Sequence, residues 1–268
     1  MEFLLFEEFV RDLRRVGEQL DLVDTLKVFT ALNPPESLDA NGKEFVEQAV
    51  KVHTISREVH TDFPILTGTL TLYIAGRFES FSRSLFEDLC QRLVQKATNF
   101  RTLPKKMQDA LIFHTAVVAQ SPRKYGFGDG AVATFIANLS NNLSNTASID
   151  AVNHQCLSIT DANMKADMLK DLFERIGVSD FWKKIGQQAS VQAHFGTGDP
   201  SSAESQAKTE LNALMDLRNN VAHPSGAITW PSQDKVRGYI KFLTVLAKAL
   251  NDLTMVFEVA LCPQPQAS

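Results

Sequence analysis

The sequence predicts an all-α fold, a bundle of helices. Apolar residues recur at steps of three and four through most of the 268-residue chain, which is the spacing of one face of a helix. Proline or glycine interrupts this pattern between segments, and no segment shows convincing strand alternation. Hydrophobic residues make up 44% of the chain, so it is long enough and apolar enough to bury a sizeable core.

Two helices are expected in the first 62 residues. The first spans residues 2–30, with one apolar face made of Phe6, Phe9, Val10, Leu13, Val16 and Leu20. Asn33-Pro34-Pro35 ends it, because proline lacks the amide hydrogen that a helix interior requires. The second spans about residues 42–60, with an apolar face made of Phe45, Val46, Ala49, Val52 and Ile55. We interpret residues 1–62 as an N-terminal helical extension packed on the bundle.

Three more helices are expected in the middle of the chain. A long helix occupies about residues 66–99, and the next runs from Pro104 to about Gln120, where Ser121-Pro122 stops it. The loop 125–130 leads into a third helix, whose apolar face consists of Val132, Phe135, Ile136 and Leu139. Residues 141–150 are poor in apolar side chains and are expected to form a loop.

Four helices complete the predicted bundle. One spans residues 163–176 and stops before Gly177, and a short one spans residues 180–188. After a loop at residues 195–200, a helix spans residues 203–222 and is stopped by Pro224. The last spans about residues 232–261 and is ended by Pro263. The predicted helical domain thus covers residues 63–262, and residues 263–268 form a flexible tail.

Composition restricts the function. The formal net charge of -4 argues against binding of nucleic acid through bulk positive charge, so any RNA contact must be local. Cys90, Cys156 and Cys262 lack the spacing of a zinc site or redox pair, which favours a reducing compartment. The N-terminus is acidic rather than signal-like, and no run approaches the roughly 20 apolar residues of a membrane-spanning helix. We expect a cytoplasmic protein without membrane contact, cofactor or metal.

The candidate chemistry lies in the segment Arg218-Asn219-Asn220-Val221-Ala222-His223, at the end of a predicted helix. At about 100° per residue, Asn219 and His223 share one face, whereas Arg218 lies roughly 140° from His223. One straight helix therefore does not bring Arg218 and His223 together. The long arginine side chain, a distorted last turn or a second copy across a two-fold axis could converge them. The alternative is that both side chains offset the helix dipole and cap the last carbonyls.

This segment resembles the Arg-x-x-x-x-His signature of the HEPN superfamily (higher eukaryotes and prokaryotes nucleotide-binding), including its polar residue after the arginine. The apolar helix before it, the long helix after it and Phe78-Glu79-Ser80-Phe81 upstream fit the same pattern. Residues 163–178 are also similar to a segment of the RiboL-PSP branch. Pro224 departs from the pattern, because many members have glycine after the histidine.

The resemblance implies metal-independent RNA cleavage in a site shared by two HEPN domains, and hence a homodimer. His223 would exchange a proton with the ribose 2′-OH or the leaving 5′-oxygen, and Arg218 would bind the phosphate. Asn219 would orient His223 or bind a phosphate oxygen. The products would be a 2′,3′-cyclic phosphate and a 5′-hydroxyl. The resemblance also suggests a toxin or antiviral defence effector with an antitoxin or complex partner. The alternative is a non-catalytic HEPN interaction module.

Supporting residues are predicted around this segment. Glu79 is assigned a supporting role in the facing helix, and the alternative is an exposed carboxylate. The candidate RNA contacts are Asn220, Lys105, Lys106, Arg123 and Lys124. Basic residues of this kind more often form a solvated face. His53 and His60 could share a helix face, but they have no third ligand nearby in the sequence, which argues against a metal site.

Overall fold

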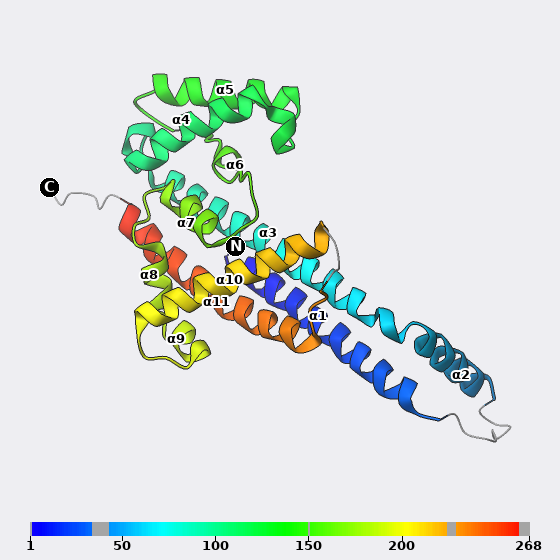
Figure 1. The fold of residues 1–268 in the computed structure, drawn as a ribbon. Coiled ribbons are helices and arrows are strands. Elements are labelled where there is room, and N and C mark those ends of the chain that lie inside the picture. Colours follow the sequence, from blue (N-terminus) through cyan, green and yellow to red (C-terminus); the bar gives the residue numbers. More distant parts are fainter. Residues whose placement is uncertain (1, 34–42, 150, 224–228, 263–268) are drawn as a thin grey trace.

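The computed structural model describes residues 2–33, 43–149, 151–223 and 229–262. Within these ranges the chain forms helices and no strand (Figure 1), which confirms the predicted all-α class. No helix in the described part is long and apolar enough to cross a membrane. Pro34, Pro35, Pro224, Pro263 and the predicted tail at 263–268 lie outside the described residues.

Three long helices form the centre of the fold: α1 (Glu2–Ala31), α3 (Phe63–Lys96) and α11 (Gln233–Leu261). They pack against one another, and α10 (Pro200–Ala222) packs on α3 (Figure 1). Their apolar faces share one core, in which the rings of Phe9 and Phe81 stack with centroids 4.9 Å apart. The N-terminal helix α1 therefore contributes to the same hydrophobic core as α3 and α11.

Shorter helices cover this centre. Helices α7 (Ala166–Glu174), α8 (Phe181–Gly186) and α9 (Ala189–Phe195) add side chains to the main core. Helices α4 (Lys105–Gln120), α5 (Asp129–Ser144) and α6 (His154–Leu157) lie together at one end (Figure 1), and α4 and α6 also contribute to the main core. Val118, Phe135 and Cys156 form a second, smaller core within that end layer. The layer therefore carries its own apolar packing beside the main core.

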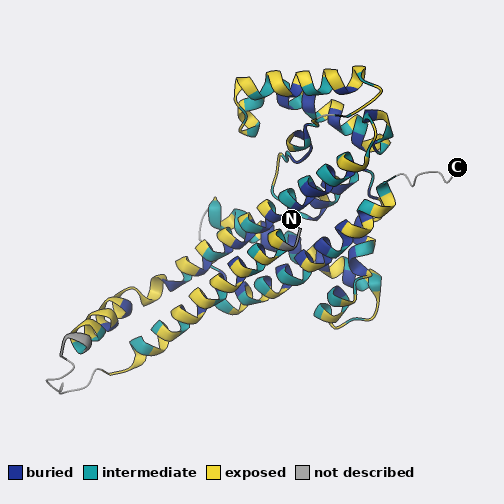
Figure 2. Cartoon of the chain, turned by 180° about the vertical axis from the view of Figure 1, so that it is seen from behind, coloured by how far each residue is buried: buried dark blue, intermediate teal, exposed yellow. Residues whose placement is uncertain are grey.

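Helix α2 (Lys43–Glu58) pairs with the far end of α1, and this hairpin extends away from the centre (Figure 1). Most of its surface is exposed (Figure 2). The predicted apolar face of α2 is wrong at Val52 and Ile55, which are 46% and 49% exposed, whereas His53 is buried. The imidazole of His53 lies 2.9 Å from the carbonyl of Leu32 and packs edge-on against Phe29. Because of this hydrogen bond, the face of α2 that carries His53 is turned toward α1, and the face that carries Val52 and Ile55 is turned toward solvent.

Several predicted boundaries are corrected by tertiary contacts. Helix α5 continues through Ser144 because the buried Asn142 donates to the carbonyl of Ala151 at 2.7 Å. Helix α10 begins at Pro200, where the Asp199 side chain accepts hydrogen bonds from two backbone amides. Helices α6 and α9 were not predicted, because one or two turns are too short to show periodicity. Helix α7 ends at Glu174, two residues before the predicted end at Ile176, and Gly177 follows in a turn with a positive φ of 101°.

Candidate functional site

The segment with the candidate chemistry forms the end of α10. His223 follows the last helical residue, and its backbone amide still donates to the carbonyl of Asn219 at 2.9 Å. The His223 side chain is exposed, and it makes no hydrogen bond to any other described residue. Its imidazole is therefore open to solvent, and no cap by this ring is seen within the described part of the chain.

Arg218 and Asn219 are brought together by their side chains. The guanidinium of Arg218 donates through Nη1 to Oδ1 of Asn219 at 3.3 Å, and both residues are half-buried. The same oxygen accepts a hydrogen bond from Nδ2 of Asn163. The Asn219 side chain is thus bound to Arg218 and Asn163, while its backbone carbonyl is bound by His223. Between described atoms, no hydrogen bond joins the Arg218 and His223 side chains.

Asn163 belongs to a segment, residues 157–166, that we call the strap and that runs from the last residue of α6 to the first residue of α7. It crosses from α3 to α10. The predicted helix start at Asn163 is wrong, because residues 163–165 are non-helical and α7 begins only at Ala166. The strap brings together polar residues that are far apart in the sequence.

One face of α3 binds the strap. A carboxylate oxygen of Glu79 accepts from the backbone amide of Met164 at 3.1 Å. One turn further on, the Arg83 guanidinium donates to the Thr160 hydroxyl, and in the next turn Glu87 accepts from Ser158. Glu79 is therefore not a free surface carboxylate; it is half-buried and holds the strap through a hydrogen bond.

One face of α10 binds the other end of the strap. Asn212 accepts from the backbone amide of Ala166 at 2.8 Å, Asp216 pairs with Lys165, and Asn219 accepts from Asn163. These three α10 residues recur at steps of four and three, so they share one helix face. Glu79 of α3 and Asn219 of α10 are consequently linked through two consecutive strap residues.

Two further side chains satisfy the strap's backbone carbonyls. Arg175 donates to the carbonyls of Leu157 and Ile159, at 2.5 and 2.7 Å, and the Trp182 indole donates to that of Ala166 at 2.8 Å. Neither these contacts nor the roles of Asn212 and Asp216 were predicted from the sequence. The polar residues at helical spacing on α10 are the one signal that could have indicated a bound segment.

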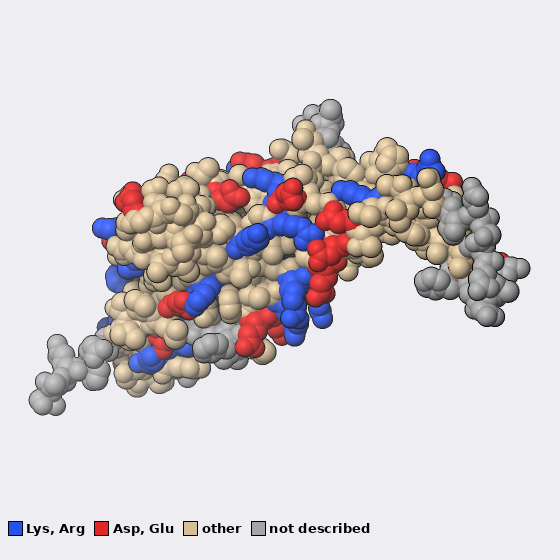
Figure 3. Space-filling view, turned by 90° about the horizontal axis from the view of Figure 1, so that it is seen from below, with Lys and Arg blue, Asp and Glu red and all other residues tan. Residues whose placement is uncertain are grey.

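The predicted RNA-contacting cations are mostly paired with carboxylates. Lys105 pairs with Asp109 at 2.6 Å and Arg123 with Asp129 at 3.7 Å, while Lys106 is exposed. Lys124 bonds to Asp161, and this hydrogen bond raises the pKa of the lysine and lowers that of the carboxyl. On the face seen in Figure 3, basic and acidic side chains are intermixed.

The remaining predicted contact, Asn220, is exposed next to Asn219. No cluster of three or more histidine, cysteine, aspartate or glutamate residues that could hold a metal ion occurs within the described ranges.

The sequence matches the RiboL-PSP-HEPN family over residues 39–255. The matched region contains α2, α3, the strap, α10 and most of α11, and it begins inside the segment that was expected to be an extension. No curated protein and no solved structure matches the chain. Since the matched region covers most of the sequence, the chain belongs to the RiboL-PSP-HEPN family, and this membership indicates a nuclease-type or RNA-related function.

Proposed function

We propose that this protein is a metal-independent endoribonuclease that cuts RNA by attack of a ribose 2′-OH on the adjacent phosphate. The observation that carries the proposal is the exposed imidazole of His223 at the end of α10, one helical turn and a half after a half-buried Arg218. Family membership supports it. Because the 2′-OH is the nucleophile, RNA would be cut and DNA spared.

The two side chains have complementary chemistry. An imidazole exchanges protons near neutral pH, so His223 would remove the proton from the 2′-OH or protonate the leaving 5′-oxygen. A guanidinium presents a planar fork of donors, so Arg218 would bind the phosphate as its negative charge is redistributed. Only one Arg218 nitrogen is bonded to Asn219, which leaves other donors for a phosphate.

A homodimer with a shared site is part of the proposal. Within one chain, Arg218 is directed to Asn219 and the strap, whereas His223 is exposed beyond the helix end. A two-fold pairing of α10 ends would place His223 of each copy near Arg218 of the other. The intracellular setting of a toxin or antiviral effector, with an antitoxin or complex partner, remains a proposal drawn from the family resemblance alone.

A non-catalytic interaction module is the second candidate. It is favoured by the bonding of Glu79 and Asn219, because both side chains hold the strap and are thus explained without a reaction. The exposed His223 has no such structural role among the described residues, and for this reason we prefer the nuclease.

The deciding experiment is RNA cleavage by the wild type, Arg218→Ala and His223→Ala in the presence of a chelator. The proposal expects cleavage by the wild type with 2′,3′-cyclic phosphate ends, and losses of about a hundredfold or more in both folded variants. His60→Ala removes another exposed histidine and should retain activity. Equal activity in all four proteins would refute the proposal, and a folded wild type that cleaves no RNA would favour the interaction module.

A further inference from the structure

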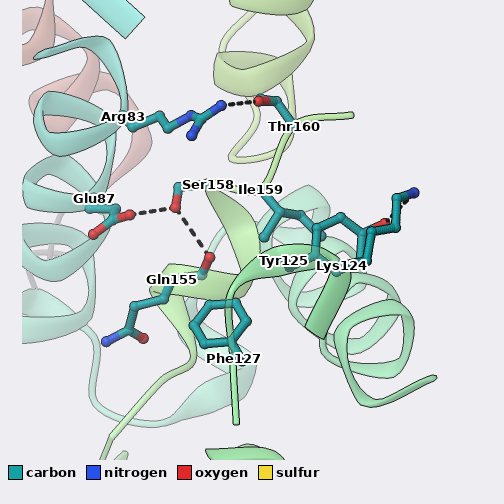
Figure 4. A pocket seen from close by; sticks show the side chains of 9 residues that line it. All are labelled: Arg83, Glu87, Lys124, Tyr125, Phe127, Gln155, Ser158, Ile159 and Thr160. Atoms are coloured by element: carbon teal, nitrogen blue, oxygen red, sulfur yellow. Dashed lines mark hydrogen bonds between the residues drawn. The ribbon is translucent and has the colours of Figure 1, made fainter. Parts of the chain in front are cut away.

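A pocket lined by both polar and apolar groups lies beside the strap, on the side of α3 that faces the end layer of helices (Figure 4). Its volume is about 420 Å³, within the range of roughly 300–1,000 Å³ that is usual for small-molecule sites. It is lined by residues from α3, from the segment before α5, from α6 and from the start of the strap: Arg83, Glu87, Lys124, Tyr125, Phe127, Gln155, Ser158, Ile159 and Thr160.

The α3 wall presents one cation and one carboxylate. Arg83 and Glu87 are one turn apart, and each is bonded to a strap hydroxyl, Arg83 to Thr160 and Glu87 to Ser158 (Figure 4). Both keep unused capacity, since a guanidinium has five N–H donors and a carboxylate accepts about four hydrogen bonds. In addition, Nε of Arg83 is buried without a hydrogen-bond partner. This wall can therefore donate and accept at neighbouring positions.

Two aromatic rings line the pocket near this polar wall. Phe127 is fixed by an edge-on contact with Phe135, with centroids 5.1 Å apart, and the Tyr125 hydroxyl is bonded to Asp161 at 3.2 Å. Both rings are only half-buried, so part of their surface is free to contact a ligand. Aromatic surfaces beside hydrogen-bonding groups are the usual elements of sites that bind an unpaired base.

We infer that this pocket binds an unpaired guanine base of the RNA substrate, an inference that rests on the proposed ribonuclease function. Guanine presents O6 and N7 as acceptors, which suit the donors of Arg83. Its N1–H and 2-amino group are donors, which suit the carboxylate of Glu87. Adenine carries an amino group at the position of O6 and lacks the N1–H and 2-amino donors, so it would meet Arg83 with a donor and offer no Watson–Crick-edge donors at N1 and C2 to the remaining acceptor positions of Glu87.

The pocket is connected to the candidate cleavage site. Arg83 lies one turn from Glu79, about 6 Å along the axis of α3. From Thr160 in the pocket wall, the strap leads within three residues to Asn163, which is bonded to Asn219 beside Arg218. A base held in the pocket would thus be anchored to the same rigid segment that positions Arg218, and cleavage should occur near guanines.

Binding of mononucleotides tests the pocket without any need for catalysis. Isothermal titration of the full chain should show binding of guanosine monophosphate at least about tenfold tighter than of adenosine monophosphate. Glu87→Gln should remove this preference, because an amide cannot accept both guanine donors. The control Glu18→Gln, an exposed carboxylate on α1, should leave it unchanged. Thermal unfolding of each variant verifies folding.

The outcomes separate the two proposals. His223→Ala should bind guanosine monophosphate as tightly as the wild type, since His223 does not line the pocket. Binding of guanosine monophosphate by a protein that cuts no RNA would support the guanine site and contradict the proposed ribonuclease function. RNA cleavage without guanosine preference, equal binding of both nucleotides, or full competition by inorganic phosphate alone would overturn the guanine site. Failure of Glu87→Gln to reduce binding would overturn it as well.

Discussion

Asn163 of the strap donates a hydrogen bond from its side-chain amide to the side-chain oxygen of Asn219 on α10. The next strap residue, Met164, donates its backbone amide to Glu79 on α3. Through these two contacts the strap fixes the spacing of the two helices that carry the candidate site, and it leaves Asn219 oriented toward Arg218.

Replacement of Asn163 tests this relationship. Asn163→Ala leaves the Asn219 oxygen without one donor, so the free energy of unfolding should fall by about 1 kcal/mol. RNA cleavage should fall by about tenfold or more, because Arg218 loses its fixed neighbour. Urea denaturation and a cleavage assay measure the two effects. Asn141→Ala, an exposed asparagine on α5, is the control and should change neither. Unchanged cleavage by Asn163→Ala would show that the strap does not position the site.

Two substitutions of Glu79 distinguish its role as a hydrogen-bond acceptor from a role of its negative charge. Glu79→Gln keeps an oxygen that can accept from Met164, so we expect cleavage within about threefold of the wild type and little change in stability. Glu79→Ala removes the acceptor and should cost about 1–3 kcal/mol of unfolding free energy. If folded Glu79→Gln loses cleavage by more than about tenfold, the negative charge itself takes part in the reaction.

Arg218→Lys tests whether the guanidinium fork is needed. Lysine keeps the charge but cannot bind Asn219 and two phosphate oxygens together, so cleavage should drop by at least about tenfold in a folded protein. Arg101→Lys, at an exposed position, provides the matched control. Wild-type rates of RNA cleavage by Arg218→Lys would mean that a positive charge alone is sufficient and that the planar guanidinium is not needed.

A mixture of Arg218→Ala and His223→Ala tests the shared site. If each site takes Arg218 from one copy and His223 from the other, half of the randomly mixed dimers contain one intact site of two. The mixture should then recover about a quarter of the wild-type activity. Exchange of subunits is followed by native mass spectrometry. Complete inactivity of a mixture with proven heterodimers would place both residues in one copy.

His114 predicts an acid-sensitive stability. Burial, with a smaller effect of the nearby Arg175, lowers the pKa of His114 from 6.5 to about 4. Between pH 6.5 and 4 the unfolded chain therefore binds a proton at His114 that the folded chain does not bind. The free energy of unfolding is unaffected by this proton above pH 6.5 and decreases as the pH falls toward 4. Relative to His114→Gln, the wild type should lose about 1–2 kcal/mol over this window, after allowance for partial exposure of the ring.

Urea denaturation at several pH values measures this difference. His60→Gln, which removes an exposed histidine, serves as the control variant. A parallel decline of the wild type and His114→Gln between pH 6.5 and 4 would contradict the assignment.

The sequence was sufficient to predict the long helices, because their cores repeat at helical spacing and their ends carry proline or glycine. It also located the exposed His223 at the end of a helix, since Pro224 follows it directly. The strap could not be predicted in this way. Its residues have no periodicity, and their partners lie on two helices that are remote in the sequence.

Two other differences have the same origin. His53 is buried although the apolar pattern of α2 placed it outward, because one hydrogen bond to Leu32 outweighs a weak preference between helix faces. The pocket beside Arg83 and Glu87 was not predicted either, since its wall combines four segments whose proximity is a product of the fold.

The strap also has a consequence for the synthesis of the chain. Helix α3 ends at Lys96 and α10 ends at Ala222, so 222 − 96 = 126 residues must be added before the second helix is complete. At about 5–20 residues per second, translation needs roughly 6–25 s for this distance. For nearly all of that time the nascent chain has Glu79 but neither Arg218 nor Asn219. If the protein is the proposed nuclease, a chain whose translation is interrupted before Arg218 lacks the candidate site and should not cut RNA.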